Sequence, residues 1–126
     1  MCHIGAAPGS LADLLDLLRP GDILTHAYSG AGNNIVQGGK LLPAALAAKQ
    51  RGVIFDVGHG GGSFDYTVCE PAMQQGAAPD TISSDIHAVS INTPGYPTLP
   101  NVMSKLLTSN IPADARCSSL AMHRTS

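Results

Sequence analysis

Four side chains of metal-binding type stand at or just after the ends of short apolar runs in this sequence. His3, His26 and Asp85 close three such runs, and His59 follows a fourth at residues 53–57. In a parallel α/β barrel, chemistry gathers at the carboxyl ends of the strands. We therefore expect these side chains to meet at one rim, where two imidazoles and a carboxylate could hold a metal ion.

The residue types suit hydrolysis by metal-activated water. Zinc prefers imidazole nitrogen and carboxylate oxygen in an open site that leaves room for water. The metal lowers the pKa of bound water to about 7 and polarises a carbonyl group. A carboxylate beside that water can carry its proton to the leaving group, which is the role expected of Asp85. Each residue also has a structural interpretation, as a hydrogen-bonded rim histidine or as a capping or turn aspartate.

The glycine-rich segment 58–62 surrounds His59. Glycine lets the backbone approach a ligand closely, so His59 is expected either to contact substrate or to be a structural rim residue. The segment lacks the motifs of phosphate-binding loops, which leaves nucleotide binding as a minor alternative. His87 is expected to support the site or the fold, and Cys2 to be a small buried hydrophobe.

Helical patterns separate the apolar runs. Leucines recur at helical spacing after the N-cap residue Ser10. Further helices are predicted at residues 40–51, 63–75 and 102–108, strands up to His3 and at 22–26, 53–57 and 81–86, and a loop at 27–39. This alternation predicts a parallel sheet with right-handed crossovers, about half of an eight-unit α/β barrel.

Composition narrows the possible partners. The 126 residues, 44% of them hydrophobic, suffice for about one domain with a core. A net charge of −2 without a basic stripe argues against nucleic acid. There is no apolar run of roughly 18 residues to span a membrane and no signal-peptide pattern. Three widely spaced cysteines fit free thiols in a reducing compartment, so a cytoplasmic location is expected.

Three longer stretches, RPGDILTH at residues 19–26, RGVIFDVGHG at 51–60 and TISSDIH at 81–87, resemble the amidohydrolase superfamily. The closest likeness is to its dihydroorotase-like amidohydrolases and deacetylases, and it runs from Met1 to about Pro112. The resemblance implies a metal-dependent (β/α)8 hydrolase with a binuclear, usually zinc, centre. Such an enzyme would act on amide, cyclic amide or acetyl ester bonds of small-molecule substrates.

The resemblance also implies roles for individual residues. Histidines that end the fifth and sixth strands of the family bind one metal, and they match His3 and His26. An aspartate that ends the eighth strand binds the other metal and serves as general acid/base, and it matches Asp85. His59 would end the seventh strand and face the substrate.

Two parts of the family pattern have no counterpart here, the HxH pair of the first strand and the carboxylated lysine of the fourth. We therefore expect a carboxyl-terminal half, with residues 1–112 forming a half-barrel, 113–126 an irregular tail, and Met1 an internal methionine. Whether the chain alone is an enzyme stays open, and it is expected to be inactive by itself. The alternative is a non-catalytic half-barrel that self-associates as a homo-oligomer or pairs with a complementing half, because open sheet edges invite association.

Overall fold

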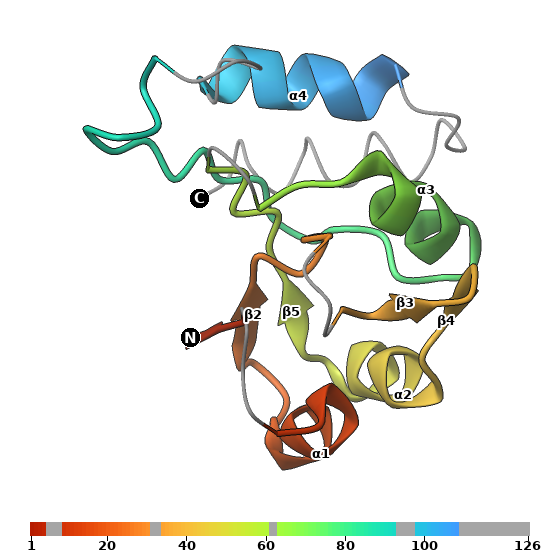
Figure 1. Ribbon diagram of the computed structural model, residues 1–126. Helices are drawn as coiled ribbons and strands as arrows, with labels where there is room; N and C mark the ends of the chain where they lie inside the picture. Colours follow the sequence, from red (N-terminus) through yellow and green to blue (C-terminus); the bar gives the residue numbers. More distant parts are fainter. Residues whose placement is uncertain (5–8, 31–33, 61–62, 93–97, 109–126) are drawn as a thin grey trace.

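A short parallel sheet forms the centre of the protein. The computed structural model describes residues 1–4, 9–30, 34–60, 63–92 and 98–108 (Figure 1). The sheet has the order β1 (Cys2–His3), β2 (Ile23–Thr25) and β5 (Ile54–Phe55), with all strands parallel. A parallel bridge between Asp56 and Thr81 continues this order to a fourth chain segment. The predicted sequential parallel arrangement is confirmed in these residues.

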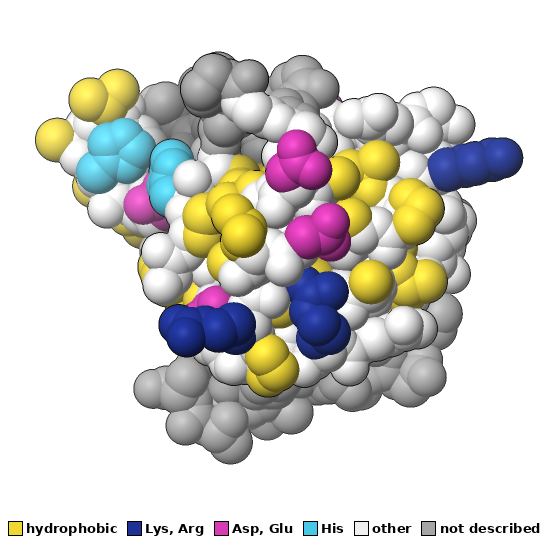
Figure 2. All heavy atoms as spheres, turned by 90° about the horizontal axis from the view of Figure 1, so that it is seen from below, with side chains coloured by type: hydrophobic (Ala, Val, Ile, Leu, Met, Phe, Trp, Pro, Cys, Tyr) yellow, Lys and Arg dark blue, Asp and Glu magenta, His cyan; other side chains and the backbone are white. Residues whose placement is uncertain are grey.

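The helices that follow the first strands pack beside each other. Helix α1 (Leu11–Leu17) contacts α2 (Pro43–Arg51), and the buried residues are Leu11 and Leu15 of α1 and Ala45 and Ala48 of α2. The Arg51 guanidinium donates hydrogen bonds to the carbonyl oxygens of Leu15 and Leu18, at 2.6 and 3.1 Å. These bonds add a partner for the Leu15 carbonyl, which also accepts the Leu18 amide, and supply one for the Leu18 carbonyl at the end of α1. The face in Figure 2, seen from this end, mixes hydrophobic side chains with charges of both signs.

Two further helices lie toward the other end of the sheet. Helix α3 (Tyr66–Gln74) begins later than predicted because Asp65, not Ser63, is its cap and accepts the Thr67 amide at 2.8 Å. Helix α4 (Leu99–Thr108) begins earlier than predicted, since Pro100 fits the first turn, where its missing N–H costs no bond. Figure 1 shows α4 above the rest of the fold, at the far side from α1 and α2.

The predicted loop at 27–39 and helix start at residue 40 are wrong in part. Strands β3 (Val36–Gln37) and β4 (Lys40–Leu41) form an antiparallel hairpin. Its two turn residues, Gly38 and Gly39, have φ of 62° and 77°, as a tight hairpin turn with two left-handed residues requires. Helix α2 then begins at Pro43, because proline is favoured at the first helical position.

The strand predicted at 81–86 is reduced to the single bridge at Thr81. The segment still lies along the chain that follows β5: the amides of Val57 and His59 donate to the carbonyls of Thr81 and Ser83, at 3.1 and 3.0 Å. Regular pairing is lost because Gly58 has a φ of 50°, outside the extended range.

Residues 109–126 lie outside the described part, so the predicted tail and its boundary at residue 112 stay predictions. Within the ranges that the structure describes, helices are too short or too polar to cross a membrane.

Candidate metal centre and active site

His26 is held in one orientation at the end of β2. Its backbone turns into the left-handed region, with a φ of 56°, and its side chain is buried, with 5% exposed. The Nδ1 atom lies 2.6 Å from the carbonyl oxygen of Gly58. Because a carbonyl only accepts, Nδ1 carries a proton, and Nε2 is the ring nitrogen left to bind a metal ion when the ring is neutral. Metal-binding histidines are commonly oriented by such a bond from the second ring nitrogen.

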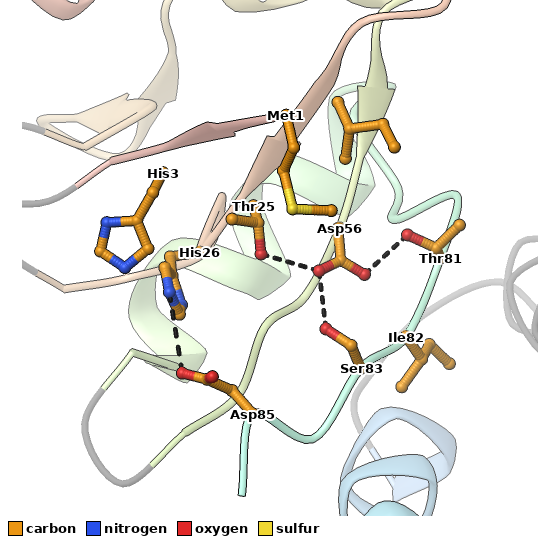
Figure 3. A pocket seen from close by; sticks show the side chains of 10 residues that line it. Met1, His3, Thr25, His26, Asp56, Thr81, Ile82, Ser83 and Asp85 are labelled. Atoms are coloured by element: carbon orange, nitrogen blue, oxygen red, sulfur yellow. Dashed lines mark hydrogen bonds and ion pairs between the residues drawn. The ribbon is translucent and has the colours of Figure 1, made fainter. Parts of the chain in front are cut away.

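His3 and Asp85 lie on either side of this ring, as Figure 3 shows. The imidazoles of His3 and His26 meet edge to face, with centroids 4.1 Å apart. The Oδ2 atom of Asp85 is 3.8 Å from Nε2 of His26. Asp85 shares the unusual left-handed backbone of His26, with a φ of 50°. The structure thus brings three predicted site residues to one open pocket of about 760 Å³.

These side chains are of types that bind metal ions, but there are too few of them to complete a site. Two imidazole nitrogens and a carboxylate oxygen are ligands that zinc and related divalent ions prefer. The bond of Nδ1 to Gly58 leaves Nε2 of His26 as the nitrogen for this use. Among the residues that the structure describes, however, no three His, Cys, Asp or Glu side chains are placed to hold one ion together. A complete site would need ligands from elsewhere.

Asp56 is a component of the pocket that the sequence reading did not single out. Its carboxylate is buried, with 4% of the residue exposed, and lies at the centre of Figure 3. Hydroxyl groups of Thr25 and Ser83 donate to its Oδ2 at 2.7 and 2.6 Å, and Thr81 donates to Oδ1 at 2.6 Å. The sequence feature that could have pointed to Asp56 is that it is the lone carboxylate in the apolar run at 53–57.

His59 lies apart from the three clustered residues. Its ring is buried against Phe64, with centroids 5.3 Å apart, and it does not line the pocket. Nδ1 bonds to the Gly60 carbonyl at 2.6 Å, and Nε2 lies 2.8 Å from Nζ of Lys105 in α4. Burial lowers the pKa of His59, the bond to Gly60 opposes this, and the charge of Lys105 lowers it further. Burial also lowers the pKa of Lys105.

The remaining predicted residues have local contacts. His87 is exposed, and its Nδ1 lies 3.0 Å from the Ser90 hydroxyl, within the turn that follows Asp85. Nδ1 also lies 3.1 Å from the Asp85 carbonyl oxygen, and the supporting role of His87 stays a prediction. Cys2 is a free thiol packed against the core, but it is partly buried and not buried as predicted.

Comparisons with curated proteins find deacetylases. The chain is 39% identical over 113 residues to a deacetylase of Brucella anthropi and 38% identical over 113 residues to one of Agrobacterium fabrum. Each match covers 89% of this chain and 28% of the relative. A deacetylase of Enterococcus faecalis is 40% identical over 109 residues, which cover 84% of this chain and 29% of that protein. The chain therefore spans less than a third of the length of these relatives. No protein-family model matches the chain.

Solved structures define the class of fold. A structure of an adenine deaminase matches 90% of this chain and 32% of its own, with a TM-score of 0.82 and 34% identity. A structure of a dihydroorotase matches 97% of this chain and 33% of its own, with a TM-score of 0.81 and 35% identity. The parallel βα units are thus part of an α/β barrel of the TIM type, as predicted. The chain belongs to the amidohydrolase superfamily, whose members are generally metal-dependent.

Proposed function

We propose that this chain contributes part of the active site of a metal-dependent deacetylase or amidohydrolase. His3 and His26 would bind one metal, most simply zinc, and Asp85 would bind a second and act as general acid/base. The orientation of His26 carries this proposal, because its Nε2 lone pair faces the shared pocket beside Asp85. The names of the deacetylase relatives support removal of an acetyl group, and we extend the proposed substrates to acetyl esters, amides and cyclic amides of small molecules.

The residues of this chain would divide the chemistry among them. A bound divalent metal would supply a nucleophilic water and polarise the scissile carbonyl. Asp85, half exposed at the pocket, would take a proton from the nucleophile and pass it to the leaving group. The Gly58 carbonyl would keep His26 in the tautomer that can bind metal.

We assign His59 a substrate-side role at the same rim, because it follows β5 and adjoins Gly60 near Asp85. A methyl group added at Gly60 would lie 3.1 Å from Oδ2 of Asp85, so the segment bearing His59 borders the general acid/base. The contact of His59 with Lys105 would have to open for the ring to meet substrate directly.

The incomplete ligand set predicts weak metal binding by the chain alone. We expect zinc binding in calorimetry to weaken at least about tenfold in His26→Asn, the scale of losing even a supporting partner of a metal ligand. The comparison variant is His87→Asn, an exposed histidine that does not line the pocket but contacts the Asp85 backbone carbonyl at 3.1 Å, so it should weaken zinc binding much less than His26→Asn does. Equal zinc binding by wild type and His26→Asn would contradict the assignment. Tight zinc and turnover by the isolated chain would show that no further ligands are needed.

An alternative is that the chain is a non-catalytic half-barrel that self-associates or pairs with a complementing half. Strand β1 favours this reading, since in the described part it pairs with β2 on one side only. An exposed strand edge is a template for pairing with another chain. Light scattering should then show dimers or larger species, and a monomer at high concentration would count against it.

A further inference from the structure

We propose that Asp56 is a positioning residue that sets the His26 imidazole and the Asp85 carboxylate relative to each other. The proposal deepens the proposed function and rests on it for its catalytic meaning. Asp56 itself would touch neither the metal nor the reacting atoms. Its effect would pass through hydroxyl groups that neighbour the two functional residues in the chain.

A single oxygen atom makes the link. Oδ2 of Asp56 accepts hydrogen bonds from both Thr25, at 2.7 Å, and Ser83, at 2.6 Å. Thr25 directly precedes His26, and Ser83 stands two residues before Asp85. Figure 3 shows these bonds converging on Asp56, to one side of the His26 and Asp85 pair. The segment that carries His26 and the segment that carries Asp85 are therefore both bonded to one carboxylate oxygen, which lies directly after β5.

The residues being positioned need such support. His26 and Asp85 are the non-glycine residues of the described part with positive φ, at 56° and 50°. That conformation is uncommon for residues with a Cβ atom and persists where the surroundings impose it. The hydrogen bonds to Asp56 hold the chain one residue before His26 and two residues before Asp85.

The chemistry of Asp56 also favours a specific role. Burying a carboxylate is costly unless hydrogen bonds compensate for lost water. Here three hydroxyls donate to it, and bonds to an ionised acceptor are shorter and stronger than neutral ones. A purely structural strand pair would not require a charge at this place.

Asp80, on the segment next to β5, provides a matched control. Its carboxylate accepts the Phe55 amide at 2.9 Å and pairs with Lys49, yet it does not line the pocket. Removing its charge should destabilise the fold without reaching His26 or Asp85. Asp56→Asn and Asp80→Asn thus separate a general loss of sheet stability from a specific loss of site geometry.

The test is histidine side-chain NMR on the metal-free full chain. We expect Asp56→Asn to shift the Nδ1–H resonance of His26 and to weaken the ring-to-ring NOEs between His3 and His26. Asp80→Asn should leave both signals at their wild-type positions, even if its unfolding midpoint falls. Wild-type His26 signals in Asp56→Asn, or equal changes in both variants, would overturn the proposal.

A second pair of variants covers the case in which Asp56→Asn does not fold. Ser83→Ala removes one bond to the shared Oδ2, whereas Thr81→Val removes a bond of equal length to Oδ1. Only Ser83→Ala should shift the Asp85 carboxyl carbon and the His26 ring nitrogens. Equal shifts in the two variants would overturn the proposal. Because no metal is used, absence of zinc binding by the wild type would reject the proposed function without deciding this result.

Discussion

Two buried histidines show how similar local structure leads to different chemistry. His26 and His59 follow neighbouring strands, expose 5% and 6% of their surface, and place Nδ1 2.6 Å from a backbone carbonyl. Both therefore carry the proton on Nδ1. Their Nε2 atoms differ, since that of His26 faces the Asp85 carboxylate and that of His59 faces the Lys105 ammonium. A carboxylate neighbour leaves the His26 lone pair suited to a cation, whereas His59 already has a cationic donor.

The largest expected effect is on stability, and it differs between alanine variants of the two glycines that supply these carbonyls. Gly58 and Gly60 have nearly the same φ, 50° and 52°, so alanine should cost each about 1 kcal/mol of backbone strain. At Gly58 the new methyl would lie 2.5 Å from Oγ1 of Thr25 and 2.9 Å from Nδ1 of His26. Overpacking of this kind adds roughly 1–3 kcal/mol. We expect Gly58→Ala to lower the free energy of unfolding by about 3 kcal/mol, measured by urea denaturation.

Gly60→Ala is the control for that measurement. Its methyl would approach Asp85, a half-exposed side chain that can move aside. We expect Gly60→Ala to lower the free energy of unfolding by about 1 kcal/mol, which is the backbone strain alone. Similar losses at the two positions would show that contact with His26 and Thr25 does not distinguish these glycines.

A smaller effect concerns the pH dependence of stability. The pKa of His59 is lowered in the folded protein, so the unfolded chain binds its proton more readily. Its contribution to stability is complete above roughly pH 6.5, the unfolded value, and is lost as pH falls toward the folded pKa. The slope from this one group is at most about 1.4 kcal/mol per pH unit. Denaturation series from pH 7.5 to 5 should show a shallower decline in His59→Gln than in the wild type.

The smallest effect isolates the ammonium that faces His59. Lys105→Met removes a positive charge near Nε2 while keeping an apolar stem in α4. The pKa of His59 should rise but stay below its ordinary value, because burial is the larger cause of the lowering. NMR titration of the ring protons measures this shift, and His26 in the same spectra serves as the internal reference. An unchanged His59 pKa would mean that Lys105 does not act on it electrostatically.

Part of the fold was predictable because local patterns are strong in this chain. Leucine spacing predicted α1, and apolar runs predicted the parallel strands. The hairpin of β3 and β4 was missed although Gly38–Gly39 is a turn signal, because the surrounding residues lack a clear apolar alternation. The segment after Thr81 reads as a strand, yet the left-handed turns opposite it leave it without regular pairing.

The sequence by itself determined which residue types end the strands, and parallel strands with helical crossovers bring such ends to one rim. That is why His3, His26 and Asp85 could be predicted to lie together, as they do. Only the tertiary structure decided the direction of the His26 ring nitrogens, the convergence of three hydroxyls on Asp56, and the placement of His59 beside Lys105. These depend on contacts between residues 25 or more positions apart, which local periodicity does not encode.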